Sequence, residues 1–150
     1  MKITIKHLFE VPNHTAEVAE WIYQEFWADK NELSARDLEK LLRAAKTPDQ
    51  LPLSLVAMID KKIIGTINFI VNDDSDRPEL TPWLAALIVK PNLRKQGIGS
   101  QLVNALLNKA KDLHIKKVYL GTDNPDFYTN LGAKKHEEKR PGFFIMYFNI

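Results

Sequence analysis

Hydrophobic and polar positions in the first part of the chain change from a period of two to a period of about four. Residues 2–8 alternate between polar and apolar side chains, which is typical of a half-buried strand. Between Thr15 and Ala28 an apolar residue recurs at every fourth position, at Val18, Ile22 and Phe26. This spacing predicts an amphipathic helix whose buried face carries these three side chains.

A second helix is expected to begin after Ser34. Asp37 stands three residues further on, close to the spacing of a capping box, in which the two residues bind each other's backbone N–H groups. Proline cannot continue a helix interior, so Thr47-Pro48 marks the end of this helix. Its expected buried face carries Leu38, Leu41, Leu42 and Ala45.

A β-hairpin is predicted next, because two β-rich runs, Leu53–Ile59 and Ile63–Val71, are separated only by Asp60-Lys61-Lys62. The stretch from Asn72 to Pro82 is polar, acidic and interrupted by proline, so we expect a loop. Residues 83–89 are apolar at every position, which is typical of a strand that is covered on both faces of a sheet.

A long helix over about 97–113 should follow, and 116–120 should form the next strand. Because a helix connects them, strands 83–89 and 116–120 should be parallel and joined by a right-handed crossover. The expected buried face of the long helix carries Ile98, Leu102, Leu106, Ala110 and Leu113.

A short helix over 125–131 is expected to end at Gly132, and a turn at Pro141-Gly142 separates the last two strands. The charged strand, 133–139, suits a sheet edge, where charge blocks unwanted pairing, so the apolar strand, 143–150, should lie inside. Together the elements predict an α+β (mixed α/β) fold. It has a central, mostly antiparallel sheet of about seven strands and about four helices, in a single domain over residues 1–150.

Composition narrows the class of protein. The chain has 150 residues, of which 45% are hydrophobic and 27% are charged, as in soluble globular domains. Its net charge of +2 gives no electrostatic footprint for nucleic acid. Without cysteine there is no thiolate metal site, and the four histidines are not spaced as ligands, so we expect no metal. No apolar run approaches the roughly 20 residues of a membrane span, and we expect a cytoplasmic protein.

A candidate anion site lies between the strand ending at Val89 and the long helix. Gly97 and Gly99 allow a ligand to approach the backbone closely, and the first N–H groups of a helix lack partners within it. The positive end of the helix dipole and the charges of Arg94 and Lys95 suit a phosphate group. The P-loop and dinucleotide fingerprints do not match this segment.

The run Leu87-x-Val89-x-Pro91-x-x-Arg94-x-x-Gly97-x-Gly99 resembles the acetyl-coenzyme A signature of the GNAT N-acetyltransferase superfamily, whose core is Arg/Gln-x-x-Gly-x-Gly/Ala. The segment Phe127-Tyr128-Thr129-Asn130-Leu131-Gly132-Ala133 is similar to a second family motif, an aromatic-Tyr-x-x-x-Gly segment on the next helix. The predicted order of elements also matches the family along nearly the whole chain.

The resemblance implies that the parallel strands splay apart and admit the arm of acetyl-coenzyme A (acetyl-CoA), the acyl donor. Tyr128 would be the general acid that protonates the departing thiolate, a role that suits a phenol with an ordinary pKa near ~10. The pantetheine arm would pair with the backbone of Leu87, Ile88 and Val89. The pyrophosphate would bind the backbone N–H groups of Arg94, Lys95, Gln96, Gly97, Ile98, Gly99 and Ser100.

Two positions depart from the family pattern. Many members have an asparagine that contacts the cofactor arm where this chain has Gly121; Asn124 is a candidate substitute, and capping of the following helix is its alternative role. Some members have a carboxylate base at the start of the fourth strand, where this chain has Trp83. The general base that deprotonates the amine is therefore either water or one of the carboxylates of the acidic loop, and the sequence does not decide between them. The candidate acceptor contacts are Asp74, Asp76, Glu79 and Trp83.

The sequence therefore predicts an N-acetyltransferase in which a primary amine, carried by a small molecule or a peptide, attacks the thioester directly. The alternative is a non-catalytic acyl-CoA sensor or interaction domain, which would keep the same cleft without needing Tyr128. We expect neither a nucleic acid nor a membrane as partner, and the chain as a monomer or a homodimer.

Overall fold

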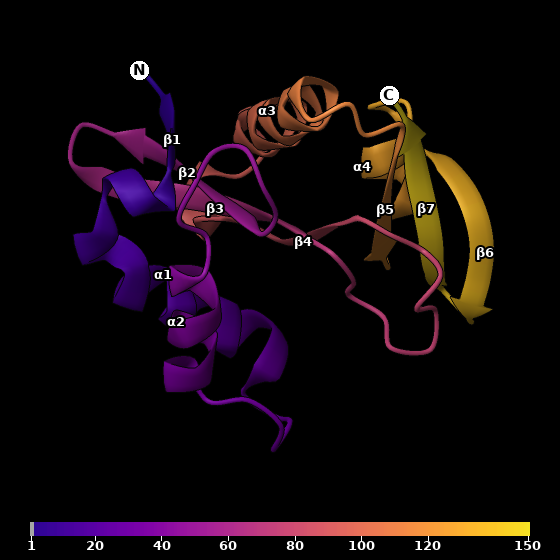
Figure 1. Cartoon of the computed structure of the whole chain (residues 1–150), viewed down its shortest axis with the longest axis horizontal. Helices are drawn as coiled ribbons and strands as arrows, with labels where there is room; N and C mark the ends of the chain where they lie inside the picture. The colour runs from indigo at the N-terminus through magenta and orange to yellow at the C-terminus, as the bar shows by residue number, and fades with distance from the viewer. Residues whose placement is uncertain (1) are drawn as a thin grey trace.

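One mixed sheet organises the protein. In the computed structural model, which describes residues 2–150, seven strands lie in the order β1-β2-β3-β4-β5-β7-β6, and β4 and β5 are the one parallel pair (Figure 1). The predicted fold class is confirmed. The strands are β1 (Thr4–His7), β2 (Leu53–Ile59), β3 (Lys62–Ile70), β4 (Trp83–Val89), β5 (Lys117–Thr122), β6 (Lys134–Arg140) and β7 (Phe143–Asn149).

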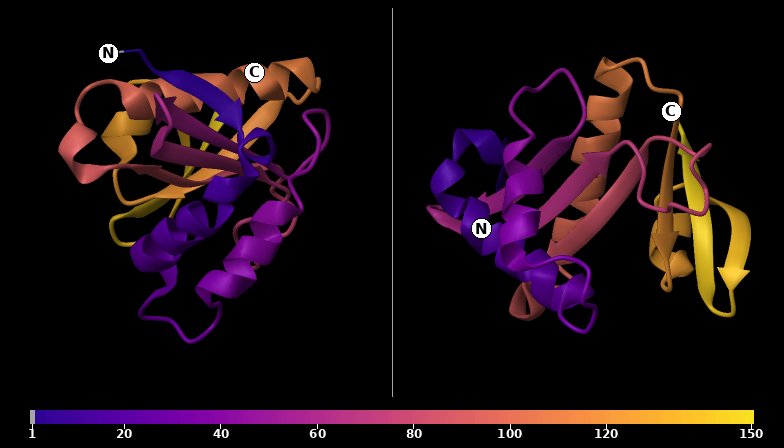
Figure 2. Two further views of the ribbon diagram at one scale, coloured as in Figure 1. Left: turned by 90° about the vertical axis from the view of Figure 1, so that its left-hand side faces the viewer. Right: turned by 60° about the horizontal axis from the view of Figure 1, so that its bottom comes forward.

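In the described residues, 2–150, four α-helices cover this sheet. They are α1 (Thr15–Ile22), α2 (Ala35–Arg43), α3 (Ile98–Asp112) and α4 (Pro125–Thr129). Helices α1 and α2 lie on one side of β1–β4 and α3 lies on the other, while α4 sits beside β5 (Figures 1 and 2). None of the helices within residues 2–150 is long and apolar enough to cross a membrane.

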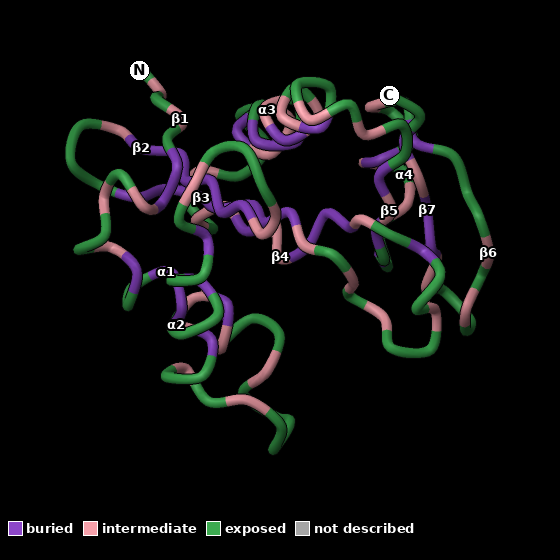
Figure 3. The backbone as a smooth tube through the Cα atoms, in the orientation of Figure 1, coloured by how far each residue is buried: buried purple, intermediate pink, exposed green. Residues whose placement is uncertain are grey.

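The largest core cluster lies between α3 and the sheet, and Figure 3 shows the buried residues concentrated along the central strands and the inner face of α3. Leu102 has no exposed surface and Leu106 is 1% exposed, as their spacing predicted. Truncating such a side chain to alanine typically lowers the free energy of unfolding by about 2–5 kcal/mol. A second cluster joins α1 and α2 to the opposite face of the sheet.

The first helix changes its winding after Ile22, and this corrects one prediction. Residues Tyr23–Trp27 form a π-helical turn, in which each hydrogen bond spans one more residue than in an α-helix. Val18 and Ile22 are buried as predicted, but Phe26 is 38% exposed. The extra residue per turn rotates Phe26 off the buried face, and Trp27 packs against the second core cluster instead.

The second helix has the predicted capping box. The Asp37 N–H donates to Ser34 Oγ at 3.1 Å, and the Ser34 N–H donates to Asp37 Oδ2 at 3.0 Å. Leu38, Leu42 and Ala45 are buried, but Leu41 is 58% exposed, so its prediction was wrong. The helix ends at Arg43, before the Thr47-Pro48 stop, and it contacts its neighbours through the Leu38–Leu42 side alone.

Candidate functional site

The sheet divides between β4 and β5. Trp83 and Tyr119 are the only residues paired across these two strands in the described part of the chain, and the Tyr119 N–H donates to the Pro82 carbonyl at 2.9 Å. From Leu84 onward, β4 has no strand partner on the side of β5. A sheet edge with unpaired N–H and C=O groups can hydrogen-bond an extended ligand as it would an added strand.

A bulge in β4 lies beside this division. The pairing of β4 with β3 shifts between Thr66, opposite Ile88, and Asn68, opposite Ala85. Within the bulge Ala86 has φ of 51°, in the left-handed region that only a few non-glycine residues adopt. This bulge was not predicted, because the left-handed position carries alanine and not glycine. Bulges of this kind turn a strand and are common next to active sites.

The connection from β4 to α3 exposes the backbone that was predicted to bind phosphate. Gly97 has φ of +83° and occupies the position before the helix, and a Cβ on it would meet no atom within 4 Å. The first helical hydrogen bond runs from the Gln101 N–H to the Gly97 carbonyl at 3.0 Å. The N–H groups of residues 98–100 therefore have no acceptor within the helix, and open space lies next to Gly97.

The side chains of this connection divide into two groups. Arg94, Lys95 and Gln96 are exposed, whereas Ile98 is 1% exposed and belongs to the core. The Arg94 Nε donates to the Val89 carbonyl at 3.0 Å, which ties the loop back to the end of β4. Ile98 can thus offer only its backbone to a ligand, as the sequence analysis expected.

Gly99 has a different role from Gly97. A Cβ on Gly99 would lie 3.3 Å from Phe127 Cζ, so the glycine permits close packing of α3 against α4. Helix α4 then ends at a turn in which the Ala133 N–H donates to the Tyr128 carbonyl at 3.0 Å and Gly132 has φ of +104°. The helix ends two residues before the predicted end at 131, and Gly132 takes the left-handed position of the turn that follows, as predicted.

Tyr128 lies on α4 and is 8% exposed. Its ring meets Phe127 edge to face, with centroids 4.9 Å apart. Burial raises the pKa of Tyr128 to about 12, so the phenol keeps its proton at neutral pH. No hydrogen bond to the hydroxyl is found among residues 2–150, and the hydroxyl is not one of the fully enclosed, unpartnered polar atoms. It is a free donor.

Asn124 precedes α4 but does not cap it with its side chain, which corrects the alternative role considered for it. Its side chain is exposed, while its backbone N–H donates to Thr122 Oγ1 at 2.9 Å. The structure also explains the glycine at position 121. A Cβ on Gly121 would lie 2.8 Å from Phe143 Cζ, so the asparagine that is common there in the family pattern would require the half-buried Phe143 ring of β7 to move.

Two acidic residues of the loop 72–82 are held by a lysine. Lys139 Nζ donates to Asp74 Oδ2 at 2.7 Å and lies 3.0 Å from Asp76 Oδ2. Burial would raise the pKa of Asp74, but the hydrogen bonds from Lys139 and the Asp76 N–H, with the nearby positive charges, lower it overall. Glu79 is exposed. Trp83 is 1% exposed and its Nε1 donates to the Leu80 carbonyl, so its side chain is part of the core.

The acidic loop also contains Asp73, which the sequence analysis did not single out. Burial by the surrounding protein and, next, the charge of Asp74 raise the pKa of Asp73 to about 6, while Lys30 acts in the opposite direction. The residue nonetheless has exposed surface, so the carboxylate is crowded by protein yet open to solvent.

The polar residues on either side of Asp73 hold the backbone of the loop. Asn72 Oδ1 accepts from the Asp74 N–H at 3.0 Å, and Asp74 Oδ1 accepts from the Asp76 N–H at 2.9 Å. These are Asx turns, in which a side chain binds the backbone two residues on. Residues 72, 74 and 76 therefore brace the loop, and Asp73 lies between them.

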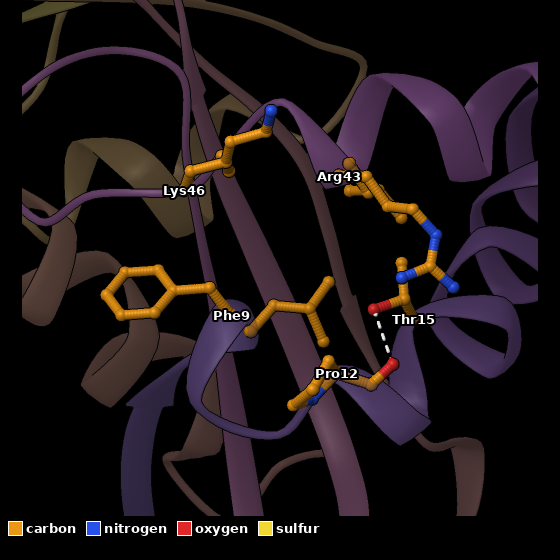
Figure 4. Close-up of a pocket in the computed structure, with 8 residues that line it drawn as sticks. Phe9, Pro12, Thr15, Arg43 and Lys46 are labelled. Atoms are coloured by element: carbon orange, nitrogen blue, oxygen red, sulfur yellow. Dashed lines mark hydrogen bonds between the residues drawn. The ribbon is translucent and has the colours of Figure 1, made fainter.

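Two surface hollows lie elsewhere. One of about 410 Å³ is lined by residues before α1 and at the end of α2, including Phe9, Pro12, Arg43 and Lys46 (Figure 4). Another, of about 420 Å³, lies at the end of α3 near Ile150. Neither includes a predicted site residue. Within residues 2–150 no group of three or more His, Asp or Glu side chains is arranged to hold a metal ion.

Comparisons with known proteins agree with this geometry. A family model described as the acetyltransferase (GNAT) family matches residues 16–133. No curated protein matches the sequence. Among solved structures, an acetyltransferase of the GNAT family from Streptococcus pneumoniae is 17% identical, covers 99% of both chains and superposes with a TM-score of 0.76.

Two further solved structures share the fold. The PaiA N-acetyltransferase from Thermoplasma acidophilum, in complex with coenzyme A, is 22% identical over 100% of both chains, with a TM-score of 0.74. The aminoglycoside 6′-N-acetyltransferase from Enterococcus faecium is 18% identical over 99% of this chain and 97% of its own, with a TM-score of 0.69. At these identities the likeness is one of fold.

Proposed function

The chain belongs to the acetyltransferase (GNAT) family, and from this premise we propose that it transfers the acetyl group of acetyl-CoA to a primary amine. The observation that carries the proposal is the divergence of β4 from β5, which leads directly to the glycine-started helix α3. An unpaired strand edge and an open helix start, side by side, suit a ligand that has an amide-containing arm and a pyrophosphate.

Acetyl-CoA would bind mainly through the backbone. Its pantetheine amides would pair with the free edge of Leu87, Ile88 and Val89, and its pyrophosphate would accept hydrogen bonds from the N–H groups of residues 94–100. The open space at Gly97 supports this placement, since a side chain there would stand where the phosphates approach. Arg94 and Lys95 add positive charge at the same place, and the exposed Asn124 amide is free to contact the arm.

Tyr128 would supply the proton for the leaving group. When an amine attacks the thioester, the sulfur departs as a thiolate, and a positioned phenol stabilises the growing charge by donating its proton. Burial and the raised pKa keep the proton on the phenol at neutral pH, so the hydroxyl is present as a hydrogen-bond donor for the leaving sulfur. A backbone N–H of β4 near Val89 would stabilise the carbonyl oxygen as it becomes negative.

Asp73 would accept the proton of the amine. Most primary amines are protonated at neutral pH and must lose a proton before they can attack. Asp74 and Asp76 are occupied by Lys139, whereas no ion pair to Asp73 is found among residues 2–150. A carboxylate whose pKa is raised toward neutrality is better matched to this task than one with an ordinary pKa. The identity of the amine is left to experiment.

The absence of cysteine makes the test direct. A thiol reagent added to the purified protein, acetyl-CoA and a panel of amines reports only the coenzyme A released, because the chain has no thiol of its own. We expect acetyl-CoA to raise the melting temperature, since it binds only the folded state, and one or more amines to release coenzyme A. No thermal shift at millimolar acetyl-CoA would refute the proposal. A shift without release by any amine would favour the non-catalytic sensor.

A further inference from the structure

Ion pairs connect the loop 72–82 to the edge strand β6, about sixty residues further along the chain. Arg77 Nε and Nη2 donate to the two carboxylate oxygens of Glu137 at 2.7 and 3.0 Å, an arrangement that fixes both distance and orientation. Lys139 Nζ binds Asp74 at 2.7 Å and Asp76 at 3.0 Å. We refer to Asp74, Asp76, Arg77, Glu137 and Lys139 as the ionic clamp.

The ionic clamp spans the place where the sheet divides. The loop leaves the end of β3 and returns into the start of β4, on the β1–β4 side, while β6 is the far strand of the β5-β7-β6 side. Figure 1 shows the loop reaching across to β7 and β6. Beneath it Leu80, Trp83 and Ile145 form a small buried cluster. The clamp therefore lies at the closed end of the β4–β5 opening.

Both partners of the clamp are built to hold a fixed position. In the loop, Asn72 Nδ2 donates to the carbonyls of Arg77 and Leu80 at 3.0 and 3.1 Å, so the segment that carries Arg77 is internally braced. In β6, the pairing with β7 shifts around His136 and again around Lys139. Such bulges redirect side chains, and here Glu137 and Lys139 both reach the loop.

We propose that Arg77 and Lys139 are positioning residues, which fix the angle between the two halves of the sheet and so preorganise the opening that receives acetyl-CoA. As a statement about ligand binding, this inference rests on the proposed function. Within residues 2–150, Trp83 and Tyr119 are the only strand pair between β4 and β5, so contacts on either side of this pair set how far the two strands diverge. An opening held near its bound shape loses less conformational freedom when the ligand arrives.

The binding test uses the variants Arg77→Met and Lys139→Met, singly and together, with coenzyme A titrated by calorimetry at 0.1 and 1 M NaCl. For the double variant we expect the Kd to rise roughly three- to tenfold at low salt, because partly exposed pairs contribute modestly. The ratio to wild type should shrink at high salt, which screens the clamp in wild type. The charge exchange Arg77→Glu with Glu137→Arg should restore binding. Arg43→Met, which breaks the exposed Glu39–Arg43 pair on α2, is the control and should leave the Kd unchanged.

A distance measurement separates failure of this inference from failure of the proposed function, because it needs no ligand. The cysteine-free chain accepts spin labels at Lys61→Cys, between β2 and β3, and Lys134→Cys, in β6. We expect a narrow distance distribution in wild type and a broadened or shifted one in the double variant. If the double variant has the same distance distribution as wild type, the inference is overturned. It is also overturned if wild type binds coenzyme A and the double variant binds it with the same affinity. A wild type that does not bind coenzyme A would instead refute the proposed function, while the distance result would still decide the role of the clamp.

Discussion

Replacing Tyr128 by phenylalanine removes one hydroxyl and keeps the ring. The ring packs in the main core cluster and against Phe127, so these contacts survive the change. Because no hydrogen bond to the hydroxyl is found among residues 2–150, we expect the free energy of unfolding to change by less than about 1 kcal/mol near pH 7. Tyr128→Phe is therefore expected to fold and to bind coenzyme A as wild type does.

The expected loss falls on turnover. With a pKa of about 12, the phenol is almost entirely protonated at pH 7 and is available as an acid. General acids typically contribute about 10²- to 10⁴-fold to a rate, and water in the opening can replace part of this. We expect kcat to fall by about 10²-fold or more, with the Kd for coenzyme A unchanged, because the hydroxyl acts on a charge that appears only in the transition state.

The raised pKa also predicts a pH effect on stability. The folded state holds the Tyr128 proton more tightly than the unfolded state, where the pKa is about 10. This contribution to stability is complete below pH 10 and is lost as the pH rises through about 12. Between pH 10 and about pH 12, the free energy of unfolding of wild type should therefore fall by more than that of Tyr128→Phe.

Steady-state thiol release with a working amine, together with calorimetry, measures both quantities. Tyr147→Phe is the control, since this tyrosine is half-buried in β7 and carries no proposed role in the reaction. Equal kcat values for wild type and Tyr128→Phe would refute the general-acid role. A large loss of coenzyme A affinity would show instead that the hydroxyl binds the ground state.

Two further substitutions test the backbone site and the base. Gly97→Val places a side chain in a left-handed position with open space, so it should lower stability by about 1–2 kcal/mol but raise the Kd for coenzyme A at least tenfold by calorimetry. Gly142→Val is the control: Gly142, in the β6–β7 turn, has φ of +78° and equally open space, so this variant should lose the same stability and bind coenzyme A as wild type does. If Gly97→Val binds coenzyme A with the Kd of wild type, the assignment of the pyrophosphate to residues 94–100 is rejected. Asp73→Asn should lower kcat/KM and remove an acid limb near pH 6, whereas Glu79→Gln should not, and an unchanged pH profile would eliminate Asp73 as base. Because the raised pKa costs the folded state stability once the carboxylate ionises, Asp73→Asn should raise the melting temperature at pH 8 but not at pH 4.

Strand and helix positions followed from local pattern where one face or both faces of an element are buried. The run Trp83–Val89 was predicted with the bounds that β4 has, because seven consecutive apolar residues between a proline and a charged loop fit a doubly covered strand. The charged strand β6 at the edge and the apolar β7 inside were predicted on the same ground. Since burial repeats with the period of the element, periodicity alone locates the buried positions.

Predictions failed where the backbone departs from regular winding. Phe26 was assigned to the buried face on a constant helical period, and the π-helical turn moved it out. The bulge at Ala86 could not be predicted locally, because its left-handed residue is alanine, which does not mark such a position in a sequence as glycine does. Both irregularities are held by contacts from other elements, and a single-segment pattern does not contain those contacts.

The candidate site shows the same division. The segment 94–100 could be read from the sequence, since its chemistry belongs to consecutive backbone groups and to glycines with local conformational demands. The contacts of the acidic loop could not be predicted from the sequence. Asp74 and Asp76 were proposed to meet the acceptor, but Lys139, more than sixty residues away in the sequence, holds both carboxylates.

By itself the sequence determined the order of the elements, the parallel pairing of β4 with β5 and the family, because each was carried by a pattern within one element, one connection or one motif. The tertiary structure alone decided how far β4 and β5 diverge, which carboxylates of the loop are paired with Lys139, and which side chain crowds position 121. These depend on pairs such as Arg77 with Glu137 and Gly121 with Phe143. At such contacts the charge or size of one residue matches that of a residue far away in the sequence, so no local pattern can specify them.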